Sequence, residues 1–135
     1  MVSGRVTMHI RARGPVPDVE QRLREALQEE GLGIITEVDL ESKIAERLGE
    51  QVGPYRLLGA CAPDLAHRAI SAWKGFGVFL PCTIALYEAG QDTAVEAANP
   101  LELPGVANNA VLAEVAREAH QRLERVLRRL EQDGS

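Results

Sequence analysis

The amino-acid sequence predicts an α+β fold built as a two-layer sandwich, in which a mixed sheet of about five strands carries helices on one face. Three observations predict it: strand-like alternation near the N-terminus, several segments of helical spacing between apolar runs, and one long apolar stripe that closes the chain. A length of 135 residues with 45% hydrophobic content suits a single domain over residues 1–135 with one core.

The first half of the chain is predicted as strand, helix, strand and short helix. Apolar residues occupy every second position of the first strand, at Val6, Met8, Ile10 and Ala12. A helix follows from Pro17 to about Glu30, where Gly31 suits the C-terminal cap. Alternation over residues 34–38 predicts a strand, and Asp39 can cap a helix with the apolar face Leu40, Ile44 and Leu48.

The second half is predicted to contain three further strands and two helices. A strand over residues 55–60 precedes a helix that Pro63 opens. Residues 77–88 are expected to form the longest strand, paired antiparallel with residues 93–98. Asn108 or Asn109 can cap a final helix whose apolar stripe runs from Val111 to Leu130.

Two stretches of the sequence resemble each other. PDVEQRLREAL (residues 17–27) is followed by GLGI, and PDLAHRAISAW (residues 63–73) is followed by GFGV. The similarity is consistent with chance or with two pseudo-repeated βαβ halves that place their helices on one face of a shared sheet, leaving the other face open.

Charge and composition exclude several classes of function. The net charge of -5 offers no excess of Lys or Arg to follow a phosphate backbone, so we expect no nucleic-acid binding. The N-terminus lacks a long apolar run, which argues against a signal peptide and membrane insertion and predicts a cytoplasmic location. Of the 15 basic residues all but Lys43 and Lys74 are arginine, a bias that fits a GC-rich genome or a thermostable protein.

The stretch from Leu58 to Cys82 contains both cysteines of the chain. Pro63 places Cys61 just before the start of a helix, where unpaired N–H groups favour a thiolate, so Cys61 is the candidate reactive thiol. Cys82 is predicted inside a strand as a buried, inert side chain. If the two strands are parallel neighbours the thiols could touch, whereas an intervening strand would separate them by roughly 10 Å.

No motif predicts a metal, a cofactor or a catalytic set. Metal-ligand spacing of cysteines is absent, and the glycine motifs lack the order of a dinucleotide fingerprint. His67 is expected on the polar side of its helix, and His9 on the wet face of the first strand. Pro81 cannot donate to a sheet ladder, so residues 80–82 should form an edge, a bulge or a bend.

The segments LGACAPDLAHRAI and FLPC resemble the signature of the family called domain of unknown function 302. The resemblance implies a compact α+β domain, dimeric and without an assigned activity, and it carries over Cys61, Pro63, Pro81 and Cys82. Some relatives are joined to redox or sulfur-metabolism modules. Relatives commonly have Asn where this chain has Ala62, and an alanine cannot cap the helix.

Two functional hypotheses follow. The leading one is a homodimeric ligand-binding or regulatory module without catalytic machinery, whose exposed row Arg5, Thr7, His9, Arg11 and Arg13, together with Arg56, accepts a partner or a small anionic ligand. The alternative is a thiol redox or sulfur-carrier protein, with a redox protein partner, that uses Cys61 as nucleophile and Cys82 as resolving or supporting thiol. A third interpretation leaves both cysteines as packing residues.

Overall fold

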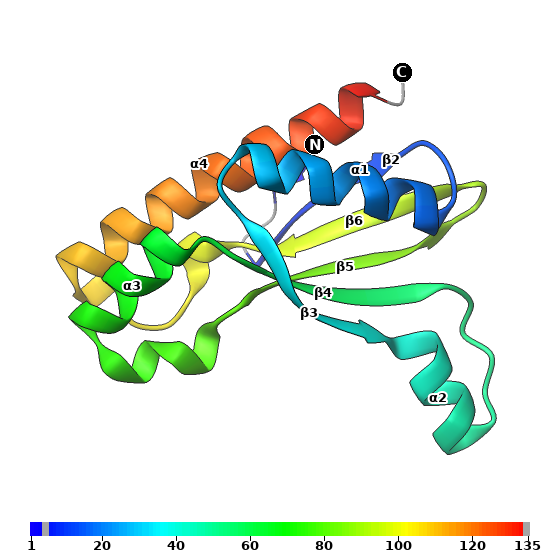
Figure 1. Cartoon of the computed structure of the whole chain (residues 1–135), viewed down its shortest axis with the longest axis horizontal. Coiled ribbons are helices and arrows are strands. Elements are labelled where there is room, and N and C mark those ends of the chain that lie inside the picture. The colour runs from blue at the N-terminus through cyan, green and yellow to red at the C-terminus, as the bar shows by residue number, and fades with distance from the viewer. Residues whose placement is uncertain (4–5, 134–135) are drawn as a thin grey trace.

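The computed structural model describes residues 1–3 and 6–133. Figure 1 shows helices α1 and α4 across one face of a β-sheet, α3 at one end of that layer, and α2 projecting from the opposite end. The strands are β1 (Val2–Ser3), β2 (Thr7–Ala12), β3 (Gly33–Asp39), β4 (Tyr55–Cys61), β5 (Cys82–Ala89) and β6 (Asp92–Ala98). The α-helices are α1 (Val16–Glu29), α2 (Leu40–Leu48), α3 (Pro63–Ala72) and α4 (Ala110–Asp133), and the 3₁₀ helices are η1 (Lys74–Phe79), η2 (Pro100–Glu102) and η3 (Val106–Asn108).

The strands form one six-stranded sheet in the order β1-β2-β6-β5-β4-β3, and every neighbouring pair is antiparallel. The predicted α+β class is therefore confirmed, but the prediction of a mixed sheet is wrong for the described strands. The chain leaves the end of β4 through α3, returns through η1 to the same end, and starts β5 beside the end of β4. Residues 55–88 consequently form no parallel βαβ unit.

One face of the sheet carries the core. Along the central strands alternate side chains point toward the helices and are fully or almost fully buried: Met8, Ile10, Leu58, Ile84, Leu86 and Val95. The stripe of α4 that covers them includes Leu123, Leu127 and Leu130. Burial of this apolar area is the main favourable term that holds the two layers together.

The helix ends follow the predicted capping residues. Asp39 accepts a hydrogen bond from the Ser42 N–H at the start of α2, and Asn109 accepts from the Val111 and Leu112 N–H groups at the start of α4. Gly31 follows α1 with φ of 79°, in the left-handed region that favours glycine. At α3 the cap residue Ala62 supplies no side-chain bond, as expected for alanine.

Residues 77–81 are not part of a strand, which corrects the predicted boundaries of β5. Residues 74–79 form η1, a bend follows at Pro81, and the strand begins only at Cys82. The physical reason is aromatic packing. Phe76 is buried and packs edge-on against Trp73 and Phe79, with ring centroids 6.0 and 5.7 Å away, and the glycines beside it disfavour a strand.

Ion pairs connect the helices to the sheet and to each other. Arg56 of β4 donates from Nε to Glu20 Oε1 of α1 over 2.9 Å, and Arg122 of α4 donates to Asp64 of α3 over 2.7 Å. Within the described residues no helix is long and apolar enough to cross a membrane.

The edge strand β3 is irregular. Its pairing with β4 shifts register between Ile34 and Thr36, which is a β-bulge, and it leaves Ile35 61% exposed. After β3 the chain enters α2, in which no residue is buried. We refer to β3 and α2 together, residues 33–48, as the arm.

Gly59 of β4 is predicted to be intolerant of any side chain. A Cβ atom at this position would overlap Thr36 Oγ1 and the ring of Pro81, and the ring has little freedom to move. Gly59→Ala should therefore lower the free energy of unfolding by about 1–3 kcal/mol, measured by urea denaturation. Gly33→Ala is the matched control, because nothing lies within 4 Å of a Cβ there. Equal stability of the two variants would contradict the prediction.

Candidate functional site

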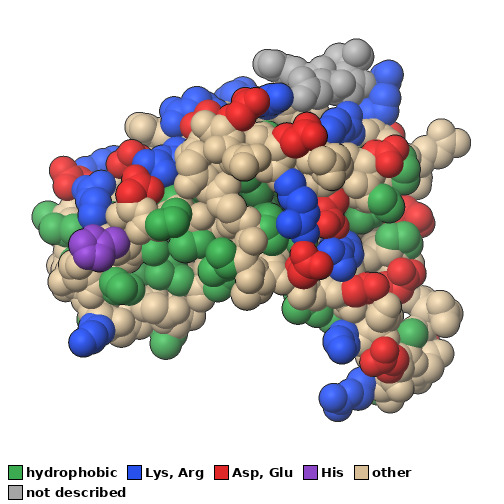
Figure 2. Space-filling model, viewed as in Figure 1, with side chains coloured by type: hydrophobic (Ala, Val, Ile, Leu, Met, Phe, Trp, Pro, Cys, Tyr) green, Lys and Arg blue, Asp and Glu red, His purple; other side chains and the backbone are tan. Residues whose placement is uncertain are grey.

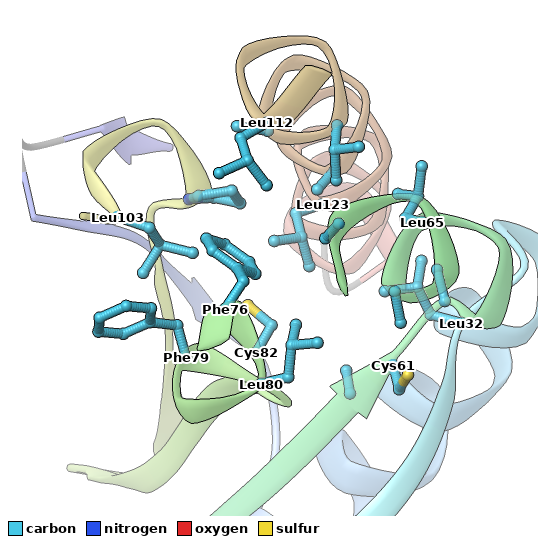
Figure 3. Close-up of a pocket in the computed structure, with 18 residues that line it drawn as sticks. Leu32, Cys61, Leu65, Phe76, Phe79, Leu80, Cys82, Leu103, Leu112 and Leu123 are labelled. Atoms are coloured by element: carbon cyan, nitrogen blue, oxygen red, sulfur yellow. The ribbon is translucent and has the colours of Figure 1, made fainter. Parts of the chain in front are cut away.

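An apolar cavity lies between α3, η1, α4 and the ends of β4 and β5 (Figure 3). Its volume is about 70 Å³. The lining consists of apolar side chains and two thiols: Leu32, Ala60, Cys61, Ala62, Leu65, Ala66, Ala69, Phe76, Phe79, Leu80, Cys82, Pro100, Leu103, Leu112, Val115, Ala116, Ala119 and Leu123. Nothing in this lining could hold a charged group without a large desolvation cost.

Short side chains on facing helices create the cavity. Ala66 and Ala69 of α3 and Ala116 and Ala119 of α4 all line the cavity, and their short side chains leave the space between the two helices unfilled. Salt bridges keep this spacing. Arg68 of α3 contacts Glu118 of α4 at 3.3 Å, and Arg122 contacts Asp64.

Two prolines position the cavity wall. Pro63 is the first residue of α3, as predicted, and fixes the point at which the chain leaves β4. Pro81 forms the predicted bend before β5 and packs over Gly59. Leu80, just before this bend, and Phe79, the last residue of η1, both contribute to the lining (Figure 3).

The two cysteines come close in the backbone but are not bonded to each other. Ala60 lies directly opposite Cys82 in the antiparallel β4–β5 pair, so Cys61 is one residue further along. The strands are thus neighbours, as one alternative required, but they are antiparallel rather than parallel. Both thiols are free and partly buried, and Figure 3 shows their sulfur atoms pointing in different directions.

Cys82 is poorly suited to nucleophilic chemistry. Burial raises the pKa of its thiol to about 11, since a thiolate would lose its hydration there. Its Sγ lies 3.7 Å from the carbonyl oxygen of Ala98, a weak S–H donor contact. The burial and the raised pKa of Cys82 give no support to its role as a resolving thiol. They fit the prediction that Cys82 is an inert, buried side chain better.

Exposed apolar side chains surround this end of the molecule. Val78 of η1 is 78% exposed and Trp73 is 42% exposed, and Ile70, Leu101 and Val111 are also exposed. Figure 2 shows hydrophobic side chains gathered over α3 and η1. We call these five residues the apolar rim.

The open face of the sheet carries a second group of functional interest, centred on Glu96 of β6. The Tyr87 hydroxyl donates to Glu96 Oε1 and the Thr7 hydroxyl donates to Oε2, both over 2.7 Å. These bonds from Tyr87 and Thr7 lower the pKa of Glu96. The bond to Glu96 and partial burial raise the pKa of Tyr87 to about 12.

The predicted cationic row is only partly assembled. Arg5 lies outside the described residues. His9 and Arg11 lie on the open face, but Arg11 donates to Asp92 over 3.1 Å and to the Ala89 carbonyl over 2.9 Å. The prediction that Arg56 joins this row is wrong. Strand alternation turns Arg56 to the helix-covered face of the sheet, where it donates to Glu20.

The Glu96 group was not predicted from the sequence. Tyr87 and Glu96 lie nine positions apart on the β5–β6 hairpin, but Thr7 comes from β2, which is 89 positions from Glu96 in the chain. Alternation placed Thr7 on the wet face, but Glu96 and Tyr87 carry no motif. Knowledge of the strand order would have brought them together. Within residues 1–3 and 6–133 no group of three or more His, Cys, Asp or Glu is arranged to hold a metal ion.

The fold and the cavity define a small antiparallel α+β domain with an apolar internal site. The family model described as "Domain of unknown function DUF302" matches residues 8–130. The chain belongs to this family.

Comparison with solved structures gives the same family. The crystal structure of an uncharacterized conserved DUF302 protein from Bacillus stearothermophilus is similar, with a TM-score of 0.84 and 27% sequence identity over 92% of this chain and 97% of that chain. The comparison with curated proteins gave no match.

The raised pKa of Cys82 predicts slow alkylation. In a Cys61→Ser variant, Cys82 should react with iodoacetamide at pH 7.5 about a hundredfold more slowly than in urea. The reason is that a thiol pKa raised by about two units lowers the fraction of thiolate about a hundredfold. The rate should still rise toward pH 10, measured by mass spectrometry. A rate that levels off below pH 9 would contradict the prediction.

Proposed function

We propose that this protein is a homodimeric binding module for a small apolar ligand, or for the apolar end of a larger one. The observation that carries the proposal is the cavity between α3 and α4, which is lined by apolar groups and thiols. Dry cavities of this kind bind small hydrocarbons. Two unbridged cysteines are also consistent with action in the cytoplasm.

The size of the cavity limits what enters it. A volume of about 70 Å³ is well below the several hundred Å³ of a typical ligand pocket, so only a small apolar group fits inside. The apolar rim offers a surface on which the rest of a longer ligand can lie. A carboxylate or phosphate on that ligand would remain outside in water.

A second copy of the chain is the proposed partner of the arm. Leu40, Ile44 and Leu48 recur at helical spacing, yet α2 buries none of its residues, and Leu48 is 72% exposed. A helix of nine residues is marginal without packing of its apolar face. Figures 1 and 2 show α2 standing away from the body of the protein, where another molecule can reach it.

The sequence of α2 is complementary to itself. In an antiparallel pair centred on Ile44, Leu40 meets the partner's Leu48 and Glu41 meets the partner's Arg47. Apolar residues then form the seam and opposite charges flank it, the pattern of an isologous two-fold contact. This charge complementarity favours a second copy over an unrelated protein.

Xenon, an apolar probe smaller than benzene, suits a cavity of about 70 Å³. Wild-type protein titrated with xenon should show saturable amide shifts in α3, η1 and α4 by NMR. Ala116→Leu should weaken binding at least about tenfold, because the larger side chain fills the space. Ala110→Leu, on the exposed first residue of the same helix, should leave binding unchanged. Absent saturable shifts, or equal binding by both variants, would overturn the ligand proposal.

Sedimentation equilibrium tests the arm. Wild-type protein should be dimeric, and Ile44→Lys should give a monomer because two like charges would meet at the centre of the seam. Glu41→Arg should weaken the dimer, and adding Arg47→Glu should restore it. Glu46→Lys, on the opposite side of α2, is the control. A wild-type monomer, or a dimeric Ile44→Lys variant, would rule out this contact.

A further inference from the structure

The open face of the sheet is hollowed around Glu96. In the strand register Glu96 lies between Ala85 of β5 and His9 of β2. The small side chains of Ala85 and Ala98 form the floor of a depression, while larger ones form its walls. Its lining residues are Thr7, Tyr55, Thr83, Tyr87 and the two alanines around Glu96.

The hydrogen bonds give this depression a defined polarity. Each hydroxyl has one hydrogen, and those of Tyr87 and Thr7 are directed to the Glu96 carboxylate. The two hydroxyl oxygens and the carboxylate therefore retain lone pairs but offer no further hydrogens. A ligand that binds to all three must itself supply the donors.

The negative charge of Glu96 also favours a ligand that donates hydrogen bonds. Within residues 1–3 and 6–133 the groups that hydrogen-bond to Glu96 are two neutral hydroxyls, so its negative charge is available to a cation. The lowered pKa of Glu96 keeps it ionised at neutral pH, and the raised pKa of Tyr87 keeps the phenol protonated. His9 faces Glu96 across β2 and β6, and Arg11 beyond it is bonded to Asp92.

Aromatic rings complete one wall. Tyr55 and Tyr87 stack with ring centroids 5.3 Å apart and planes 11° apart. Aromatic faces attract organic cations, and a stacked pair also packs against the apolar part of such a ligand.

We propose that the depression around Glu96 binds the ammonium group of a small organic amine. The three N–H donors of a primary ammonium match the oxygens of Glu96, Tyr87 and Thr7, and the carbon chain or ring lies against Tyr55. This site shares no lining residue with the apolar cavity. A cationic ligand at this site is the opposite of the small anionic ligand that the sequence predicted for this face.

Phenethylamine is the probe, with 2-phenylethanol and phenylacetate as neutral and anionic analogues of the same shape. At pH 8 phenethylammonium should produce saturable NMR shifts at the amides of Thr7, Tyr87 and Glu96. Both analogues should bind at least about tenfold more weakly, since a charge-assisted bond is lost. No saturable shifts, equal binding of 2-phenylethanol, or shifts confined to α3 and α4 would overturn the proposal.

Two variants and a control assign the binding to this site. Glu96→Gln should weaken phenethylammonium binding about tenfold or more by removing the charge. Ala85→Leu should do so by filling the floor, and it keeps the test decisive if Glu96→Gln fails to fold. Glu50→Gln removes one exposed negative charge from the α2–β4 loop and should change the affinity by less than about twofold. Unchanged affinity in a folded Ala85→Leu or Glu96→Gln protein would overturn the proposal.

Discussion

The structure depends on the burial of one apolar stripe of α4 against one face of an antiparallel sheet. Leu123, Leu127 and Leu130 are fully or almost fully buried there. Because α1 and α4 cover only this face, the opposite face stays open across β2, β6 and β5 (Figure 1). Toward its N-terminus α4 meets α3, and the alanines between these helices leave the cavity. Both candidate sites thus follow from the position of one helix.

The two sites have opposite chemistry on opposite sides of the same strands. The cavity is lined by apolar groups and thiols, whereas the depression on the open face offers a carboxylate and hydroxyl oxygens. Strand alternation produces this difference. Ile84 and Leu86 of β5 point to the core, while Ala85 and Tyr87 point to the open face.

Local signals predicted the elements well, and pairing was harder to predict. Proline at Pro63 and the caps at Asp39 and Asn109 act over a few residues, so their patterns could be read directly. The start of β5 was misplaced because Phe76 packs into the core from a 3₁₀ helix, which is a tertiary effect. Glu96 and Thr7 are separated by 89 positions, and only the strand order brings them together.

The bulge in β3 and the brevity of β1 have a consequence for the protein in concentrated solution. Regular edge strands present unpaired N–H and C=O groups that can template the addition of further chains. Among residues 1–3 and 6–133, one edge strand has two residues and the other is broken between Ile34 and Thr36. Uncontrolled growth of the sheet into fibrils is thereby discouraged, although several apolar side chains remain at the surface.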